Sequence, residues 1–335
     1  MPEKPVPVAV LFGPTAAGKT ALLVDLFCGG TGCGAEIVSA DSMQVYRGLD
    51  IGTAKPPPSL QAALPHHLID ILNPDEQFSA GEFVRRADLA CAGIHRRGLL
   101  PVISGGTGFY LKSFIQGLPD SPPPEAAIRE ELAAELQRGG RDPLIAELRE
   151  ADPESAARIH PNDDYRLLRA LEVIRMTGRP LSSYAANEES RRAKYRFLLI
   201  GLEWERETLY LRIDRRCTQM FGAGLAEEVR GLFDRGYTPD DPGLAAIGYK
   251  EFFVRDGDAW RLSSDHAGVE ALVARNSRRY AKRQITWFKK VGGVTWIKLH
   301  EGPSSKNAAE ADVTVFSAAG LRDRLSLFLE EGDGL

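Results

Sequence analysis

The first third of the chain alternates short apolar runs with segments of helical periodicity. Candidate strands cover residues 6–12, 36–40, 67–72 and 99–104. Two candidate helices lie between them. One covers residues 18–27, and the other starts after Ser79, which forms a capping-box pattern with Glu82. Strands that alternate with helices predict a parallel sheet flanked by helices.

A proline-rich stretch at residues 118–124 interrupts this alternation and marks a domain boundary, because proline disfavours helix interiors. Helical periodicity follows at residues 125–137, 143–150 and 163–176, with Gly139-Gly140 and Asp152-Pro153 as breaks. A strand pattern resumes at residues 196–202. We therefore expect a core of residues 1–118 and 195–335, and a small all-helical insertion domain at residues 119–194.

The last third mixes helix and strand patterns. Candidate helices cover residues 207–221, 224–235, 268–290 and 318–331, and a candidate strand covers residues 294–299. The third of these helices is strongly basic, because residues 271–290 include seven cations and no acid in a chain of net charge −4. Its cations share a face at helical spacing, and Tyr280 and Trp287 supply rings. This pattern fits nucleic-acid binding, and a solvated helix face fits it equally well.

The composition is that of a water-soluble globular protein, with 43% apolar and 26% charged residues. No segment approaches the roughly 20 apolar residues that cross a bilayer, and the N-terminus lacks the layout of a signal peptide. The four cysteines are scattered without a C-x-x-C pair, which excludes an obvious zinc site or disulfide framework. We expect a cytoplasmic protein that makes no membrane contact.

A phosphate-binding motif follows the first candidate strand. The string Gly13-Pro14-Thr15-Ala16-Ala17-Gly18-Lys19-Thr20 matches G-x-x-x-x-G-K-[ST] in full. In such a loop, inward backbone N–H groups and the lysine bind phosphate oxygens, and the hydroxyl of Thr20 can ligate Mg²⁺. The motif predicts a P-loop NTPase-like α/β core, but it does not identify the molecule that carries the phosphates.

Two further polar groups follow candidate strands. Asp41 comes after residues 36–40, and Thr107 stands in the second glycine-rich turn, Gly105-Gly106-Thr107-Gly108. Because parallel strands end at one edge of a sheet, both groups should lie near the phosphate loop. Asp41 could ligate Mg²⁺ or accept a proton, and Thr107 could bind a substrate oxygen. A capping aspartate and a plain tight turn fit these positions as well.

Arginine clusters are open to two interpretations. Arg212, Arg215 and Arg216 could clamp a pyrophosphate, or they could lie on a surface helix with nearby acids as partners. Arg166 and Arg169 follow the polar loop that begins at His160, and by themselves they indicate a solvated helix face.

Several strings together resemble the tRNA dimethylallyltransferases, also called tRNA isopentenyltransferases, from about Val8 to about Trp296. The strings most specific to that family are Asp50-Ile51-Gly52-Thr53-Ala54-Lys55-Pro56 and Lys282-Arg283-Gln284-Ile285-Thr286-Trp287. The phosphate loop, Ser39-Ala40-Asp41-Ser42-Met43-Gln44, Gly105-Gly106-Thr107-Gly108 and Ile247-Gly248-Tyr249 match as well. No cysteine or histidine pair follows Lys290, so the resemblance is to the bacterial form, which lacks the zinc finger of eukaryotic relatives.

The resemblance implies transfer of a dimethylallyl group from dimethylallyl diphosphate to the N6 amine of the adenosine 3′ of the anticodon in tRNA, with release of diphosphate. It implies that the phosphate loop holds the diphosphate with Mg²⁺. By the same resemblance Asp41 accepts the amine proton, Thr107 helps to hold the diphosphate, and Arg216 is the clamp. Since a flipped base must leave its stack, the enzyme needs a pocket for it.

The resemblance also implies contacts with the anticodon stem-loop of tRNA. The residues concerned are Asp41, Ser42, Met43, Gln44, Thr107, Arg129, Tyr165, Arg166, Leu167, Leu168, Arg169, Leu244, Gly248, Tyr249, Lys282, Arg283, Gln284, Ile285, Thr286, Trp287, Phe288 and Lys289. We expect a monomer whose helical insertion binds the anticodon stem of the tRNA. Three alternatives stay open at this point: a small-metabolite kinase, an enzyme that prenylates free adenine nucleotides, and an NTP-dependent RNA-binding module.

Overall fold

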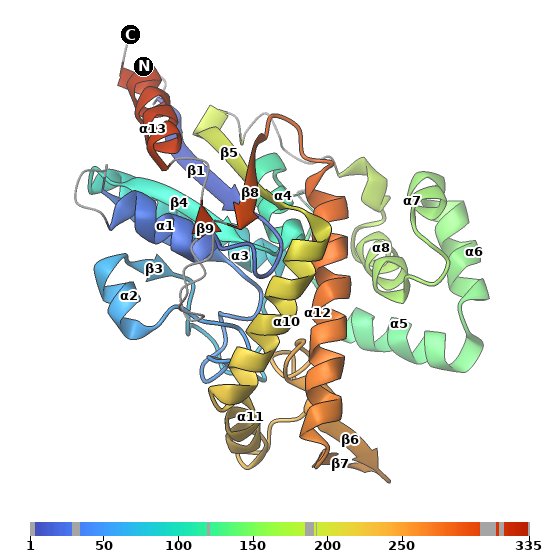
Figure 1. The fold of residues 1–335 in the computed structure, drawn as a ribbon. Helices are drawn as coiled ribbons and strands as arrows, with labels where there is room; N and C mark the ends of the chain where they lie inside the picture. The colour runs from blue at the N-terminus through green and yellow to red at the C-terminus, as the bar shows by residue number, and fades with distance from the viewer. Residues whose placement is uncertain are drawn as a thin grey trace. The chain divides into compact units, whose positions relative to one another are not determined.

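The computed structural model describes residues 4–28, 34–118, 121–184, 191, 193–301, 313–314 and 318–333 (Figure 1). The chain divides into two compact units. One combines Met1–Ile115 with Arg192–Leu335, and the other is Gln116–Arg191. Within the described ranges, no helix has the length and apolarity that crossing a membrane requires.

A seven-stranded sheet forms the centre of the larger unit, in the order β3-β2-β4-β1-β5-β8-β9 (Figure 1). Its strands are β1 (Val6–Phe12), β2 (Ala35–Ala40), β3 (His66–His67), β4 (Leu100–Gly105), β5 (Tyr195–Trp204), β8 (Thr295–Glu301) and β9 (Val313–Thr314). All neighbours pair in parallel except β8 and β9. The register places Ala9 beside Val102 of β4 and Leu198 of β5, so β1 lies in the middle of the sheet. The predicted parallel sheet flanked by helices is confirmed.

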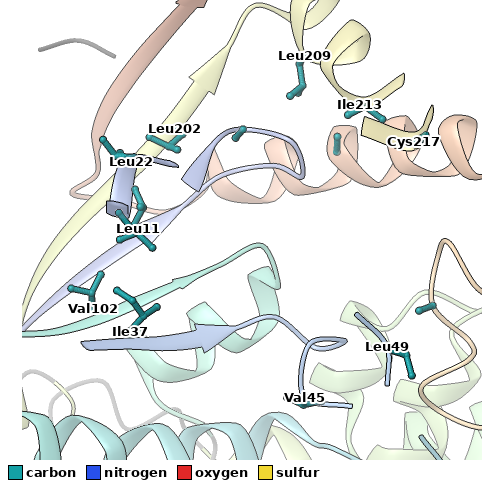
Figure 2. Packing of buried hydrophobic residues seen from close by; sticks show 14 of the residues in the cluster. Leu11, Leu22, Ile37, Val45, Leu49, Val102, Leu202, Leu209, Ile213 and Cys217 are labelled. Carbon is teal, nitrogen blue, oxygen red and sulfur yellow. The ribbon is translucent and has the colours of Figure 1, made fainter. Parts of the chain in front are cut away.

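Helices pack on both faces of this sheet because successive strand residues point to opposite faces. Leu11 of β1 contributes to one core cluster together with Leu22 of α1, whereas Val10 contributes to a second cluster with Phe83 of α3. Figure 2 shows the first cluster, in which Leu11, Ile37, Val102 and Leu202 extend from the strands. The helices of this unit are α1 (Lys19–Phe27), α2 (Pro58–Ala63), α3 (Ala80–Arg96), α4 (Gly108–Gln116), α10 (Arg206–Gly222), α11 (Leu225–Phe233), α12 (His266–Phe288) and α13 (Ala318–Asp333).

The regular secondary structure described in the smaller unit is helical. It contains α5 (Ala126–Gly139), α6 (Asp142–Ala151), α7 (Pro153–Arg158), α8 (Asp164–Thr177) and the short 3₁₀ helix η1 (Leu181–Ser183). Leu132, Leu144 and Leu171 are buried in its own core. Arg175 of α8 forms bidentate ion pairs with Glu135 of α5 and Glu147 of α6, which ties three helices together.

Four local expectations differ from the structure. The predicted strand at 67–72 is only His66–His67, because Leu68 and Asp70 take positive φ angles of 64° and 56° and end the extended conformation. Asp152-Pro153 does not merely break a helix. Pro153 begins α7, and the Asp152 carboxylate accepts the N–H of Ser155 as a cap.

The remaining differences concern a cap and a hairpin. Ser79 accepts the N–H of Glu82, but the Glu82 side chain binds Arg85 and Arg86, so the capping box is not reciprocal. Strands β6 (Phe253–Asp256) and β7 (Ala259–Leu262) form an antiparallel hairpin that we did not predict. The Asp256-Gly257 pair was the available signal, and Gly257 takes a positive φ of 60° in the turn. A 3₁₀ helix, η2 (Lys250–Phe252), precedes it.

Candidate active site

The phosphate loop connects β1 to α1 in a conformation suited to an anion. Ala16 and Gly18 have positive φ angles of 61° and 86°, and the N–H of Ala17 turns back to the carbonyl of Pro14. Within the described residues, the N–H groups of Gly18, Lys19 and Thr20 have no hydrogen-bond partner. Free N–H groups at a helix N-terminus form an anion-binding site.

Cationic side chains surround this loop. The Lys19 ammonium donates to the carbonyls of Gly13 and Pro14, at 3.0 and 3.1 Å. Burial and the neighbouring Arg216 lower the pKa of Lys19 to about 8, although Asp41 partly opposes them. Arg216 lies next to the phosphate loop, where its guanidinium donates a hydrogen bond to the hydroxyl of Thr15 at 3.3 Å. Two confined cations favour the binding of an anion between them.

Helix α10 also contacts the backbone of the phosphate loop. Arg212 donates to the carbonyl of Ala16 at 3.1 Å and lies over the ring of Trp204, whose indole N–H donates to the carbonyl of Ala17. These bonds fix the loop's backbone carbonyls. Arg212 and Arg216 thus lie against the phosphate loop, whereas Arg215 of the same cluster is exposed. A clamp on a diphosphate stays a prediction.

Asp41 directly follows β2, and its carboxylate is oriented by its own chain. Its Oδ1 atom accepts the N–H groups of Met43 and Gln44, at 2.9 and 3.3 Å. Within the described ranges, Oδ2 has no hydrogen-bond partner. This arrangement is a capping turn, as one interpretation of Asp41 expected, and the role of proton acceptor stays a prediction.

Thr107 connects the second glycine-rich turn to the segment after Asp41. Its N–H donates to the carbonyl of Ala40, and its hydroxyl accepts the N–H of Ser42 at 3.0 Å. At Gly105 a Cβ atom would lie 2.2 Å from the carbonyl oxygen of Ala40, so only glycine allows this approach. The turn and Asp41 therefore form one packed unit, as predicted from their strand ends.

Two residues of α12 connect the glycine-rich loops. The buried amide of Gln284 accepts the N–H of Thr15 at 2.9 Å and donates to the carbonyl of Gly106 at 2.8 Å. Tyr280 forms hydrogen bonds with Thr107 and Gln284, and its pKa rises to about 12 because of burial and the charge of Asp41. The phenol therefore stays protonated at neutral pH.

A cavity of about 310 Å³ opens between these elements. Polar groups of its wall come from the phosphate loop, the Asp41 segment, α10 and α12, and they include Thr15, Asp41, Arg216 and Tyr280. An apolar set lies in the same wall, made of Ile213, Met220, Ala246, Ile247 and Val273. The cavity can therefore hold a ligand that is part anion and part hydrocarbon.

A separate basic groove of about 490 Å³ lies along α12. Its lining consists of Arg279, Lys282, Arg283, Thr286, Trp287 and Lys290. Arg283 also lines the cavity beside Asp41. Trp287 packs over Gly108, where a Cβ atom would lie 2.6 Å from the indole. Four nearby cations and an aromatic ring match what a nucleic-acid strand requires.

Some of the residues expected to contact tRNA are buried, and others are exposed. The side chains of Leu167, Leu244, Tyr249 and Phe288 are at most 2% exposed, and they pack in the cores. Gln284 is also buried, with both ends of its amide used inside the protein. These five buried side chains are therefore not placed to contact RNA. They were expected to do so because the matched strings include both the inward and the outward residues of each element.

The expected contacts on the insertion are also of two kinds. Arg169 directs its guanidinium to Glu172 and the carbonyl of Pro122, so it holds the insertion's own fold. Tyr165 is 69% exposed, and Arg129 lies over its ring at 5.6 Å. Arg166 is exposed beside Asp163. Tyr165, Arg166 and Arg129 are therefore the members of this set that a ligand can reach.

Sequence reasoning missed several residues of the cavity. Val273 and Ser277 were not named, and Tyr280 was named only as a ring for nucleic acid. The three lie at positions i, i+4 and i+7 of α12, and this spacing was the signal for one shared face. Met220 and Ile213 lie on α10, and their apolar character alone did not distinguish them from core residues.

The chain is similar to known proteins over most of its length. The sequence model of a family described as IPP transferase matches residues 44–291. A tRNA dimethylallyltransferase of Geobacter sulfurreducens is 47% identical over 291 residues, which cover 87% of this chain and 91% of the relative. One from Symbiobacterium thermophilum is 46% identical, with coverage of 92% of this chain and 94% of the relative.

Two solved structures are also similar. The tRNA isopentenylpyrophosphate transferase of Bacillus halodurans is 36% identical, with a TM-score of 0.63 and 98% coverage of both chains. A eukaryotic dimethylallyltransferase acting on tRNA is 25% identical, with a TM-score of 0.73, and the match covers 96% of this chain and 80% of that one.

Proposed function

This chain belongs to the IPP transferase family, and we propose that it is a tRNA dimethylallyltransferase. It transfers a dimethylallyl group from dimethylallyl diphosphate to the exocyclic N6 amine of the adenosine 3′ of the anticodon, and it releases diphosphate. The names of the relatives, which cover most of the chain, support this activity.

The cavity beside Asp41 is the observation that carries the proposal. Its wall joins Thr15 and Ala16 of the phosphate loop and Arg216 to an apolar set on α10 and α12. A nucleoside triphosphate would need polar partners for its sugar, whereas a prenyl diphosphate needs an apolar surface next to an anion site. The loop at 13–20 then stabilises a leaving diphosphate instead of transferring a phosphoryl group.

The reaction follows from these positions. The N6 nitrogen attacks C1 of the dimethylallyl group, a C–N bond forms, and the bond between C1 and the diphosphate oxygen breaks. The loop N–H groups, Lys19 and Arg216 hold the negative charge that develops on the diphosphate. The free Oδ2 atom of Asp41 accepts the proton from the amine. Tyr280 and Thr107 hold the segment on which Asp41 lies.

The residues present fit a Mg²⁺ ion that is bound mainly through its substrate. Among the described residues, no group of three or more His, Cys, Asp or Glu side chains could hold a metal by itself. The hydroxyl of Thr20, exposed at the start of α1, is the protein ligand that we propose, with Oδ2 of Asp41 as the alternative. Mg²⁺ suits such a site because it keeps waters and binds substrate phosphates. When bound, it would neutralise charge on the diphosphate.

We assign the basic groove of α12 to the backbone of the tRNA, since exposed Arg279, Lys282 and Lys290 line it. Tyr165, Arg166 and Arg129 of the insertion are the further contacts that we propose. We propose that the enzyme acts as a monomer. We propose that it acts in the cytoplasm, where tRNA is the substrate.

The alternatives raised by the phosphate loop are not favoured. The relatives that match most of this chain are named for transfer to tRNA, which no metabolite kinase performs. An enzyme that prenylates free nucleotides would have no use for the long basic groove. An RNA-binding module without chemistry would not need the free Oδ2 of Asp41 next to the anion site.

A transfer assay tests the proposal. Purified protein is incubated with Mg²⁺, labelled dimethylallyl diphosphate and unmodified tRNA that carries adenosine next to the anticodon, and in a parallel reaction with free AMP. We expect label in the tRNA alone. Label in AMP would favour the free-nucleotide enzyme, and ATP hydrolysis without labelled tRNA would overturn the assignment to prenyl transfer.

A further inference from the structure

Glu228 of α11 lies outside every motif that the sequence analysis singled out, yet its carboxylate accepts four hydrogen bonds. Oε2 accepts the N–H groups of Asp50 and Ile51, at 3.1 and 2.8 Å. Oε1 accepts the N–H of Gly52 at 3.2 Å and the hydroxyl of Tyr249 at 2.6 Å. A carboxylate that accepts several hydrogen bonds at once is held rigidly, and it holds its donors equally rigidly.

The segment that Glu228 binds, residues 50–55, has little freedom of its own. The Tyr249 ring covers Gly52 so closely that a Cβ atom there would lie 2.5 Å from the ring. At the other end, the ammonium of Lys55 is buried and binds Asp50, Asp70 and the carbonyl of Tyr46. Burial and the charge of Glu228 raise the pKa of Tyr249, which keeps its hydroxyl a donor.

This segment leads directly to the reacting site. Gly52 and Thr53 line the cavity beside Asp41. The carbonyls of Thr53 and Ala54 accept the side-chain amide of Gln44, at 3.2 and 3.3 Å. The backbone N–H of Gln44 in turn donates to Oδ1 of Asp41. A continuous series of hydrogen bonds therefore runs from Glu228 through residues 50–54 and Gln44 to the carboxylate of Asp41.

We propose that Glu228 is a positioning residue, which fixes the orientation of Asp41 through residues 50–54 and Gln44, with Tyr249 as its donor partner. The inference rests on the proposed role of Asp41 as proton acceptor. Glu228 binds neither substrate, because its two oxygens are used by the protein. It acts on the chemical step and leaves the phosphate loop and the basic groove in place.

The experiment compares Glu228→Gln with Glu227→Gln, an exposed neighbour on the same helix that loses the same charge. An amide cannot accept N–H groups at both ends, so Glu228→Gln must release part of the segment. We expect its single-turnover transfer rate at saturating substrates to fall about 10- to 100-fold, since small misplacements of a reacting group have effects of this size. Dissociation constants for tRNA and for dimethylallyl diphosphate should stay within about twofold of wild type, given the limited reach of local contacts.

A second variant separates positioning from general stability. Tyr249→Phe keeps the ring over Gly52 and removes only one of the four bonds, so we expect a smaller loss of rate with an unchanged melting temperature. A Glu228→Gln rate equal to that of Glu227→Gln would overturn the inference. So would equal losses in rate and in tRNA affinity, which indicate a general structural role. If wild-type protein transfers no label at all, the proposed function has failed instead.

Discussion

The inner and outer sides of helix α12 differ in burial and in the kind of group that they present. On the inner side, Gln284 and Tyr280 are bonded to the phosphate loop and the second glycine-rich turn. On the outer side, Arg279 and Lys282 are exposed and line the basic groove. One short string thus combines residues that hold the two glycine-rich loops with exposed cations that a polyanion can reach. Proximity in sequence is a poor guide to shared function on a helix.

Replacing Asp41 should have the largest effect and should be confined to the cavity. Asp41→Asn keeps the shape but removes the proton acceptor, so we expect the transfer rate to fall about 10²- to 10⁴-fold. The tRNA dissociation constant, which depends on the outer side, should hardly change. Exposed Asp75 offers the matched control Asp75→Asn. Full activity in Asp41→Asn would contradict the assigned role.

Truncation of Gln284 tests the inner side of α12 directly. Gln284→Ala leaves the N–H of Thr15 and the carbonyl of Gly106 without their partner, at a penalty of about 1–3 kcal/mol. We expect binding of dimethylallyl diphosphate, measured by calorimetry, to weaken by roughly 5- to 150-fold. Lys282→Ala, two positions away, should leave this affinity intact. If Gln284→Ala weakened tRNA binding more than donor binding, the two sides would not be separate.

Alkaline pH should weaken donor binding through Lys19. The pKa of Lys19 is lowered to about 8. Its side chain is therefore positively charged below that pH and loses its proton and its charge as the pH rises above it. Diphosphate favours the charged form, so its affinity should fall about tenfold between pH 7 and pH 9. Titrations with the wild type and with Lys19→Arg, which stays charged, check this. An equal decline in both would point to another group.

Removal of outer cations should have the smallest effect, and its clearest sign is a change in salt dependence. Arg279→Ala combined with Lys282→Ala should lower the slope of log affinity for tRNA against log salt by about 2, with little change in the transfer rate at saturation. Arg96→Ala, an exposed cation on α3, is the control. An unaltered slope would indicate that this side of α12 is only a solvated face and does not bind tRNA.

The strands of the core could be predicted from the sequence, because apolar runs such as residues 6–12 are buried strands. The phosphate-loop motif also predicted the turn in which Gly18 has a positive φ angle. It also placed Asp41 and Thr107 together, since both follow parallel strands. Local exceptions came from backbone conformation. The strand ended early because Leu68 and Asp70 have positive φ angles, a conformation that is uncommon for leucine and was therefore not expected there.

The roles of Gln284 and Glu228 could not be read from the sequence for a different reason. Gln284 binds a residue 269 positions away, and Glu228 binds a segment about 177 positions away. Nothing local to either residue indicates such a partner. Resemblance to a family assigned Gln284 and Tyr249 to RNA, whereas burial shows that both side chains serve the protein's interior.

The position of β1 in the sheet has a consequence for how the chain is made. Val6 at its start pairs with Tyr195 of β5, so one edge of this apolar strand has no partner until more than half of the chain has left the ribosome. An open apolar edge is prone to pair with other chains. Synthesis of the entire helical insertion must be completed during this interval. We therefore expect the nascent chain to be prone to incorrect strand pairing at this edge until β5 has been synthesised.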